Sequence, residues 1–345
     1  MSGALSPLQE ALLRCCADPE GEHGGLAELL GAASPREAAY LFELTRTGPL
    51  AEFCLARAAD GPPAMAVQLA RLSRRQTLHA LSQARGLVRA AGLLRDAGIE
   101  CIALKGAALA FRDYPAPQLR PLRDIDLLVR PDEAEAAQAL LLSHPGYRKP
   151  AWAGPYGIDY GHQLPEIEDQ DNAVVIEIHH RLNARGWAGE PHLLEAMWCS
   201  DETIELLGTT VRVPTTQANL LHLIEHATLH HGFSNGPLVL ADLHFIATRA
   251  QPDWDAISHA AARMGLTRAM ILVAQIARQF GARWVPPALA QRAQSAAPYA
   301  PAAAAAMFAG REQVEAHDQL QRLRRRAEGK SGVLAALSRI SRPER

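Results

Sequence analysis

Two carboxylates stand one residue apart in this chain, at Asp124 and Asp126, inside a run that is otherwise apolar and strand-like. Alternate residues of a strand point to the same face of a sheet, so both carboxylates leave one face while Ile125 and Leu127 point into the core. Two like charges this close repel and raise each other's pKa unless a cation lies between them. Closely spaced carboxylate oxygens suit Mg²⁺ or Mn²⁺ that holds a nucleoside triphosphate. The alternative is a strand end at which one aspartate caps the next helix and the other is solvated.

A third carboxylate, Glu177, stands in the middle of Val174–His180, where apolar and polar residues alternate. The alternation predicts a strand that places Glu177 and His179 on one face. An unpaired buried glutamate is costly, and a metal ion shared with the two aspartates would remove that cost. His179 could ligate the metal, act as a base or only hydrogen-bond the site, whereas His180 points to the other face.

These segments carry a family resemblance. They are Leu104–Gly106, Arg120–Val129, Gly146 with Tyr147, and Ile176–His180. The chain resembles the DNA polymerase β-type nucleotidyltransferase superfamily, and within it a branch of uncharacterised bacterial nucleotidyltransferase family proteins, over roughly residues 65–290. The resemblance implies Mg²⁺-dependent transfer of a nucleotidyl group from an NTP to a hydroxyl-bearing acceptor (a small molecule, a sugar or a protein), with release of pyrophosphate. It implies that Asp124, Asp126 and Glu177 are both the catalytic residues and the metal ligands.

The chain departs from the superfamily at the turn that usually reads Gly-Gly or Gly-Ser, because here the turn is Lys105-Gly106. Gly106 still allows a close backbone approach at a helix N-terminus, which is a site for anions. Lys105 supplies a point charge in place of the hydroxyl, and Arg120 would offset further phosphate charge. The departure also favours an alternative, a nucleotide-binding or regulatory protein that has this fold without the transfer activity.

A helical segment farther along the chain gathers histidines on one predicted face. Its residues at i, i+3, i+4 and i+8 are His222, Glu225, His226 and His230. Three interpretations stay open: structural histidines at a helix–helix contact, a second metal site, and helices that close over the nucleotide cleft with His226 and His230 near phosphate or acceptor. The second would make the protein a metal phosphohydrolase that uses residues 222–244, including Asp242 and His244. The motif has neither an adjacent His-Asp pair nor an HExxH sequence, so we do not expect a dedicated zinc site.

The predicted elements around the carboxylates follow the order strand, helix, strand, helix and two strands. They cover residues 99–104, 106–113, 123–129, 131–142, 163–167 and 173–179, and the last two form a hairpin. This order predicts an α+β fold, with the small mixed α/β-type sheet of a nucleotidyltransferase core between N- and C-terminal helical regions. We expect four parts: a helical region at 1–95, the core at 96–188, a helical domain that closes the cleft at 189–311, and a basic flexible tail at 312–345.

Outside the core, residues 64–97 read as one long helix or a kinked pair, because leucines recur at helical spacing. Ser34–Glu37 and Pro214–Gln217 each read as a helix start. Residues 209–213 read as a strand, and residues 295–308, rich in Ala and Pro, as a weakly specified helix or linker.

Composition limits the classes of partner and compartment. The chain has 35 Lys and Arg against 37 Asp and Glu, so bulk nucleic-acid binding is not expected. Its five cysteines have irregular spacings without a CxxC motif, which indicates reduced thiols rather than a disulfide framework or a zinc site. We expect no membrane span and no signal peptide, and therefore a cytoplasmic protein. The segment 321–345 holds eight Arg or Lys against two Glu, which is typical of a solvated tail or a contact with an anionic partner.

Overall fold

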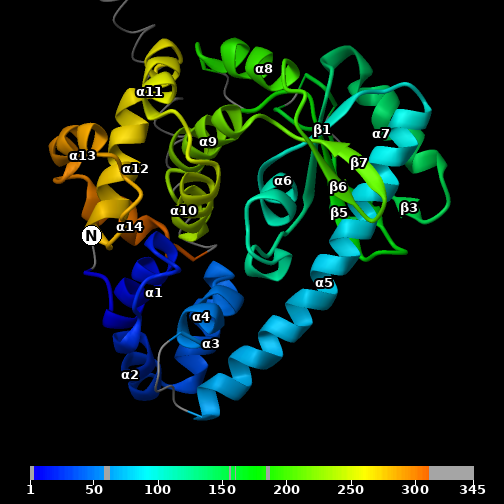
Figure 1. Cartoon of the computed structure of the whole chain (residues 1–345). Helices are drawn as coiled ribbons and strands as arrows, with labels where there is room; N and C mark the ends of the chain where they lie inside the picture. The colour runs from blue at the N-terminus through cyan, green and yellow to red at the C-terminus, as the bar shows by residue number, and fades with distance from the viewer. Residues whose placement is uncertain (1–3, 58–62, 155–156, 160, 184–186, 311–345) are drawn as a thin grey trace, which may run out of the picture.

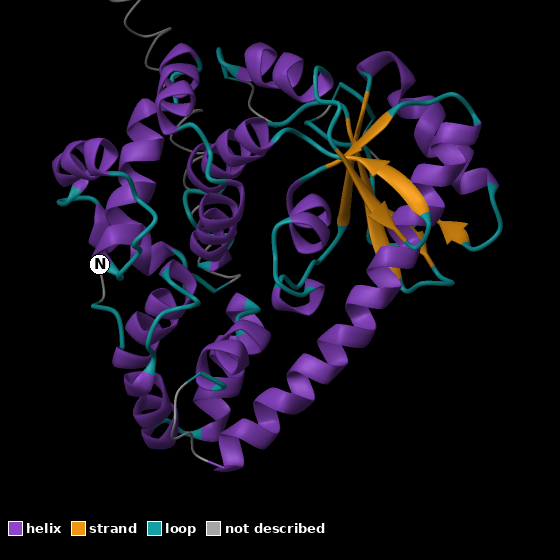
Figure 2. Ribbon diagram, in the orientation of Figure 1, coloured by secondary structure: helices purple, strands orange, loops and turns teal. Residues whose placement is uncertain are grey.

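The computed structural model describes residues 4–57, 63–154, 157–159, 161–183 and 187–310. Helices make up most of the molecule, and a small sheet lies at one side of it (Figure 2). The predicted α+β class is confirmed. The basic segment 321–345 lies outside the described residues.

The sheet has five strands in the order β1-β2-β5-β4-β3. The strands are β1 (Cys101–Ala103), β2 (Ile125–Val129), β3 (Tyr147–Arg148), β4 (Ile167–Asp169) and β5 (Val174–His179). The central pair, β2 and β5, is parallel, and the other neighbours are antiparallel. The predicted hairpin is present as β4 and β5, but its first strand spans Ile167–Asp169 rather than the predicted 163–167, where Gln163 forms an isolated bridge to His179. Strand β3, which the sequence pattern did not predict, pairs with β4 at the edge.

The two faces of the central strands have different surroundings. Ile125 and Leu127 belong to a hydrophobic core with Ile176 and Ile178, so the predicted inward direction of the first two is confirmed. This face packs against α5 (Pro63–Asp96) and α7 (Ala134–Ser143). The opposite face carries the acidic side chains. There α6 (Lys105–Arg112) starts directly after β1.

Helix α5 is 34 residues long and confirms the predicted long helix. It runs diagonally from the N-terminal helices to the sheet (Figure 1). Near its start Leu69 is buried in the helical core, and near its end Leu87 and Leu94 are buried against the sheet. Between these two contacts Leu78 is 70% exposed, whereas Ala80 and Gln83 are buried, so one side of the middle of the helix faces solvent and another is covered.

The first and last helices of the chain share one hydrophobic core. The N-terminal set is α1 (Pro7–Ala17), α2 (Gly24–Ala32), α3 (Pro35–Thr45) and α4 (Gly48–Leu55). The C-terminal set is α9 (Thr216–Glu225), α10 (Leu238–Ala250), α11 (Trp254–Arg263), α12 (Thr267–Gln279), α13 (Pro287–Ala293) and α14 (Ala300–Ala306). Helix α1 packs on α10, so the N-terminal and C-terminal sets of helices lie against each other (Figure 1).

Side-chain caps fix two of the predicted helix starts. The Ser34 hydroxyl accepts from the Glu37 backbone N–H at α3, and the Thr215 hydroxyl accepts from the Ala218 N–H at α9. Each bond satisfies a backbone donor that the helix itself leaves unpaired.

A helix and a hairpin connect the sheet to α9. Helix α8 (Glu190–Trp198) comes first, and β6 (Thr203–Leu206) and β7 (Thr209–Arg212) follow as a two-stranded hairpin. Strand β7 was predicted and β6 was not. Leu207 and Gly208 both have positive φ, as a tight hairpin turn requires. Among the described residues no helix combines the length and apolar character needed to cross a membrane.

Candidate functional site

Asp126 is the centre of the polar network on the sheet. It sits on β2 directly opposite Glu177 of the parallel strand β5, so both side chains leave the same face. The Lys105 ammonium donates to Asp126 Oδ1 over 2.9 Å, and His179 Nε2 lies 2.7 Å from the same oxygen. Burial alone would raise the pKa of Asp126, but the charge of Lys105 and the contact with His179 hold it well below its usual range.

Glu177 and His179 complete this group. His179 Nε2 lies 3.3 Å from Glu177 Oε2, and one ligand atom from each of Asp126, Glu177 and His179 falls within 4.8 Å of the others. Two carboxylates and an imidazole at this separation can hold a divalent cation. The predicted pairing of Glu177 and His179 on one face is therefore present. His180 is buried, and its backbone N–H donates to the His162 carbonyl.

Asp124 lies just before β2 and lines the same cavity. Burial, and then the neighbouring charges of Asp126 and Glu177, raise the pKa of its carboxyl to about 7 against the opposing effects of Lys105 and Arg46. Asp124 does not belong to the group of close ligand atoms formed by Asp126, Glu177 and His179, but its charge adds to theirs in the same cavity. Such a site favours an added cation or a proton.

The start of α6 explains why glycine follows Lys105. Lys105 has a left-handed backbone, with φ of 48°. A Cβ atom on Gly106 would lie 2.3 Å from Leu122 Cδ2, so the Leu122 side chain would have to move to make room for it. The Lys105 ammonium is bonded to Asp126 rather than standing free in the cavity. Its predicted role toward phosphate stays a prediction.

Arg120 is bound to the helical part of the molecule. Its Nε lies 2.6 Å from Asp242 Oδ1 and its Nη2 lies 3.0 Å from Asp242 Oδ2, a bidentate pair with α10. The Tyr114 hydroxyl donates to Asp242 Oδ1 over 2.6 Å. Arg120 does line the cavity, but its guanidinium fork is engaged by a carboxylate of the protein itself.

A cavity of about 690 Å³ joins the sheet and the helices at this point. Besides the carboxylates, its wall includes three groups that sequence reasoning missed: Arg46, Arg123 and His162. Arg46 ends α3 in a left-handed conformation and donates to the carbonyls of Pro121 and Asn235. Burial, and then the charges of Arg120 and Arg123, lower the pKa of Arg46 to about 9.

The three residues differ in how far the sequence indicates that they belong to the site. Arg123 adjoins Asp124 and could have been noticed within the motif. Arg46 lies in a helical region rich in arginine and reaches the cavity only through folding, so local sequence gives no sign of it. His162 sits in a loop between β3 and β4 without any periodic pattern.

The predicted histidine face divides into two groups. A π-helical turn, His226–His230, follows α9 and widens the helix, which changes the directions of the side chains after Glu225. His226, His230 and His231 line the cavity.

His222 is fully buried, and neither ring nitrogen has a hydrogen-bond partner among the described residues. Burial, and then nearby positive charge including Lys105, lower the pKa values of His222 and His226 well below the usual range, so both are neutral.

Of the residues of the phosphohydrolase alternative, His226 and His230 form with His231 a group whose ligand atoms lie within 4.8 Å of one another, but Asp242 and His244 do not belong to it. Asp242 is bonded to Arg120 and Tyr114. His244 lies on the far side of α10 beside Glu20, at 3.4 Å. Asn183 donates to the buried Glu225 carboxylate. His226 and His230 reach the cavity, as the cleft-closing interpretation requires.

Comparison with known proteins gives one family. Residues 32–282 match the profile of a family described as uncharacterised nucleotidyltransferase. No curated protein matches the chain. The matched region includes every carboxylate, lysine, arginine and histidine that lines the cavity. The match supports nucleotidyl transfer as the general function, and the chain belongs to the uncharacterised nucleotidyltransferase family.

Proposed function

We propose that the protein transfers an NMP group from an Mg²⁺-bound NTP to a hydroxyl-bearing acceptor, with Asp124, Asp126 and Glu177 as the metal ligands. The observation that carries this proposal is the pairing of Asp126 with Glu177 across parallel strands, on a face that opens to a 690 Å³ cavity. Ligand cavities in proteins typically measure about 300–1,000 Å³, so an NTP would fit.

The donor set suits a hard divalent cation. Carboxylate oxygens are the ligands that Mg²⁺ and Mn²⁺ prefer, and Asp124, Asp126 and Glu177 line one cavity. Burial, and then the charges of Asp126 and Glu177, raise the pKa of Asp124 to about 7, and a cation bound beside these carboxylates would offset the repulsion among them. A divalent ion bound there supplies electrostatic stabilisation for the charge that develops on the α-phosphate and on the leaving pyrophosphate.

Side chains from three elements would hold the triphosphate. Arg46 and Arg123 approach the cavity from α3 and from the loop before β2, and Gly106 offers the backbone at the start of α6. Lys105 would exchange part of its contact with Asp126 for the phosphate. His226 and His230 would face the nucleotide or the acceptor from the helical side, so that residues 189–311 close the cleft.

The chemical step forms one P–O bond and breaks another. The acceptor hydroxyl oxygen attacks the α-phosphorus, the bond to the β-phosphate oxygen breaks, and pyrophosphate leaves. The hydroxyl proton passes to Glu177, which faces the cavity. His179 stands 3.3 Å behind Glu177 and would hold that carboxylate in place.

A second candidate function is nucleotide binding without transfer. The contact between Lys105 and Asp126 favours it, because an ammonium already occupies one oxygen that the metal would need. The free cysteines suit a reducing compartment, and we propose the cytoplasm for either function.

One pair of measurements tests the proposal. Calorimetric titration with each NTP in Mg²⁺ measures binding, and incubation with α-labelled NTP and fractionated cell extract measures transfer of label. Binding and transfer that both require Mg²⁺ are expected. Binding without transfer to any fraction would favour the second candidate, and the absence of binding for all four NTPs would contradict both.

A further inference from the structure

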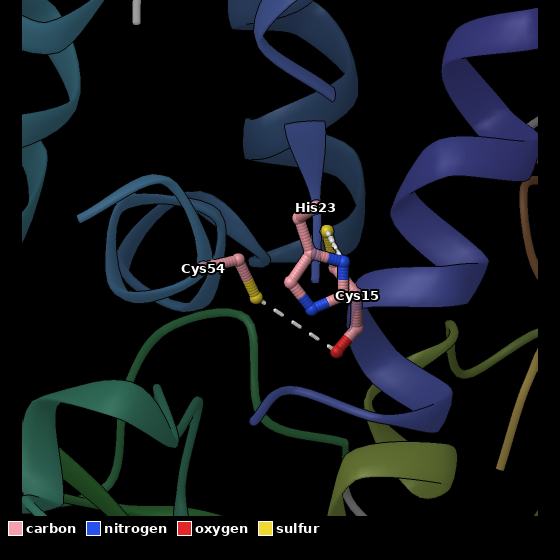
Figure 3. A group of neighbouring side chains, drawn as sticks. All are labelled: Cys15, His23 and Cys54. Carbon is pink, nitrogen blue, oxygen red and sulfur yellow. Dashed lines mark hydrogen bonds between the residues drawn. The ribbon is translucent and has the colours of Figure 1, made fainter. Parts of the chain in front are cut away.

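Another cluster of side chains of metal-binding types lies in the helical core, away from the cavity. Cys15 of α1, His23 of the loop before α2 and Cys54 of α4 converge there. One ligand atom from each residue falls within 4.8 Å of the other two. In Figure 3 the His23 ring lies between the two cysteine side chains. Because the three residues are widely and irregularly spaced, no local sequence pattern groups them.

The hydrogen bonds of His23 fix its tautomer. His23 Nε2 lies 2.9 Å from the Asp18 carbonyl oxygen, and a carbonyl can only accept, so Nε2 carries the hydrogen. Nδ1 is then left with a lone pair, 3.7 Å from Cys15 Sγ. Histidines that ligate metals commonly donate their other N–H to a backbone carbonyl in this way.

The two thiols have only weak partners. Cys54 Sγ lies 3.6 Å from the Pro19 carbonyl oxygen and 4.0 Å from that of Cys15, which are long contacts for a weak S–H donor. Both cysteines are fully buried and His23 is 8% exposed. All of the described cysteines, including these, are free thiols.

We propose that Cys15, His23 and Cys54 bind one thiophilic d¹⁰ cation, Zn²⁺ or Cu⁺, in a structural site that joins α1 to α4. Thiolate sulfur and imidazole nitrogen select such ions over Mg²⁺. Ligands bound about 2.0–2.3 Å from zinc in a tetrahedron lie roughly 3.3–3.8 Å from one another, so the side chains need to move by about an ångström or less. Each thiol loses its proton to solvent on binding.

The two ions differ in what they require. Three protein ligands complete a trigonal Cu⁺ site, whereas Zn²⁺ takes a fourth ligand. Once Cys54 is a thiolate it no longer donates to the carbonyls of Pro19 and Cys15, so one of these oxygens can become that ligand. The burial of the site agrees with a closed structural centre rather than a catalytic one.

The site is independent of the proposed nucleotide chemistry. Cys15 and His23 precede residue 32, where the family match begins. None of the three residues lines the cavity. Its effect on stability would pass through α1, which packs on α10.

Metal content and titration of the full chain test the proposal. The protein is expressed without a tag and purified without chelators, and its metal content is measured. The metal is then removed under anaerobic, reducing conditions, and the apoprotein is titrated with Co²⁺, as a probe for a zinc site, and separately with Cu⁺. We expect one equivalent of metal with a sulfur-to-metal charge-transfer band, and a higher melting temperature when it is bound.

Matched variants assign the band to these residues. Cys15→Ala and Cys54→Ala should each weaken binding by at least about a hundredfold, more than the loss of an outer hydrogen-bond partner. Cys199→Ser, at an exposed cysteine, and His226→Ala, in the cavity cluster, should keep it. If Cys15→Ala or Cys54→Ala fails to fold, His23→Gln is used in its place. The titrations of the wild-type protein test the proposal without any variant.

The possible results distinguish a zinc site from a copper site, and some of them would overturn the proposal. A tetrahedral Co²⁺ spectrum identifies a zinc site, and a charge-transfer band with Cu⁺ alone identifies a copper site. Folded wild-type protein that gives no thiolate band with either metal overturns the proposal. So does a band that survives in Cys54→Ala, or a disulfide between Cys15 and Cys54 in freshly purified protein. None of these results depends on NTP binding.

Discussion

Arg120 and Asp242 form a buried bidentate ion pair that joins the loop before β2 to α10 beside the cavity. Both side chains are almost fully removed from solvent, and the Tyr114 hydroxyl adds a third bond to Asp242. The pair fixes the distance between the sheet and the helical core at the point where the cavity lies. The stability of the fold should therefore depend on this pair.

Removing one member of this pair should destabilise the fold strongly. Asp242→Ala leaves the buried Arg120 guanidinium without its carboxylate, and we expect the free energy of unfolding to fall by about 3–5 kcal/mol. Urea denaturation measures it. The control is Glu168→Ala, which removes the partner of the exposed Arg148 and should cost about 1 kcal/mol or less. Equal effects of the two substitutions would contradict the importance of the buried pair.

The two aspartates of the motif should affect stability in opposite directions when metal is absent. Asp124→Asn relieves repulsion with Asp126 and Glu177, so the melting temperature should rise. Asp126→Asn leaves Lys105 and His179 without their shared anion, so the melting temperature should fall. Relief of repulsion alone would raise the melting temperature of both variants. The ion pair between Lys105 and Asp126 reverses that expectation for Asp126→Asn. Thermal denaturation in EDTA measures both, and a rise for both variants would show that the ion pair contributes nothing.

Nucleotide binding and transfer should respond differently to Glu177→Gln. We expect affinity for Mg-NTP to stay within about tenfold, or roughly 1.4 kcal/mol, because the triphosphate itself helps to hold one metal. Transfer should fall by about two to three orders of magnitude, as for loss of a key electrostatic group. Titration and single-turnover transfer measure the two quantities. Glu168→Gln, on the neighbouring strand β4, is the control. Unchanged transfer in Glu177→Gln would point to another acid or to His179.

The buried Glu225 should make stability depend on pH. Burial raises its pKa from 4.5 to about 7, and Glu190 adds to the shift, while Asn183 opposes it. The folded state therefore binds the proton more tightly than the unfolded state. The contribution is fully present below pH 4.5 and is lost as the pH rises to about 7. Glu225→Gln removes this loss and keeps the acceptor for Asn183, so the variant should gain stability over wild type from pH 5 to pH 8.

Urea denaturation of both proteins across that pH range measures the difference in unfolding free energy. The comparison between variant and wild type cancels the other titrating groups. A difference that is constant with pH would contradict the raised pKa of Glu225.

Local sequence patterns were enough to predict the acidic face of the sheet. The alternation in Val174–His179 and the spacing of Asp124 and Asp126 depend only on the two-residue repeat of a strand. The polar cluster after Ile167 was enough to predict a hairpin, but its first two residues, Glu168 and Asp169, belong to strand β4 rather than to the turn. Strand β3, at two residues, is too short to leave such a pattern.

The remaining features of the site depend on contacts between distant parts of the chain. Arg120 and Asp242 stand 122 residues apart, and neither carries a sign of the other. Arg46 lies at the end of α3, and its hydrogen-bond partners, the carbonyls of Pro121 and Asn235, are 75 and 189 residues away in the sequence. The π-helical turn after Glu225 breaks the 3.6-residue period. The prediction that the histidines line one face assumed a regular α-helix and was therefore only partly correct.

Helix α5 has a mechanical consequence for the whole molecule. Its 34 residues make a rod about 50 Å long, anchored in the helical core at Leu69 and against the sheet at Leu87. Between these anchors Leu78 is exposed, whereas Ala80 and Gln83 are buried and the Gln83 amide donates to the Leu122 carbonyl just before β2. A straight helix keeps its anchors apart by about 1.5 Å for each residue between them. Helix α5 therefore acts as a spacer that sets how far the helical core lies from the sheet.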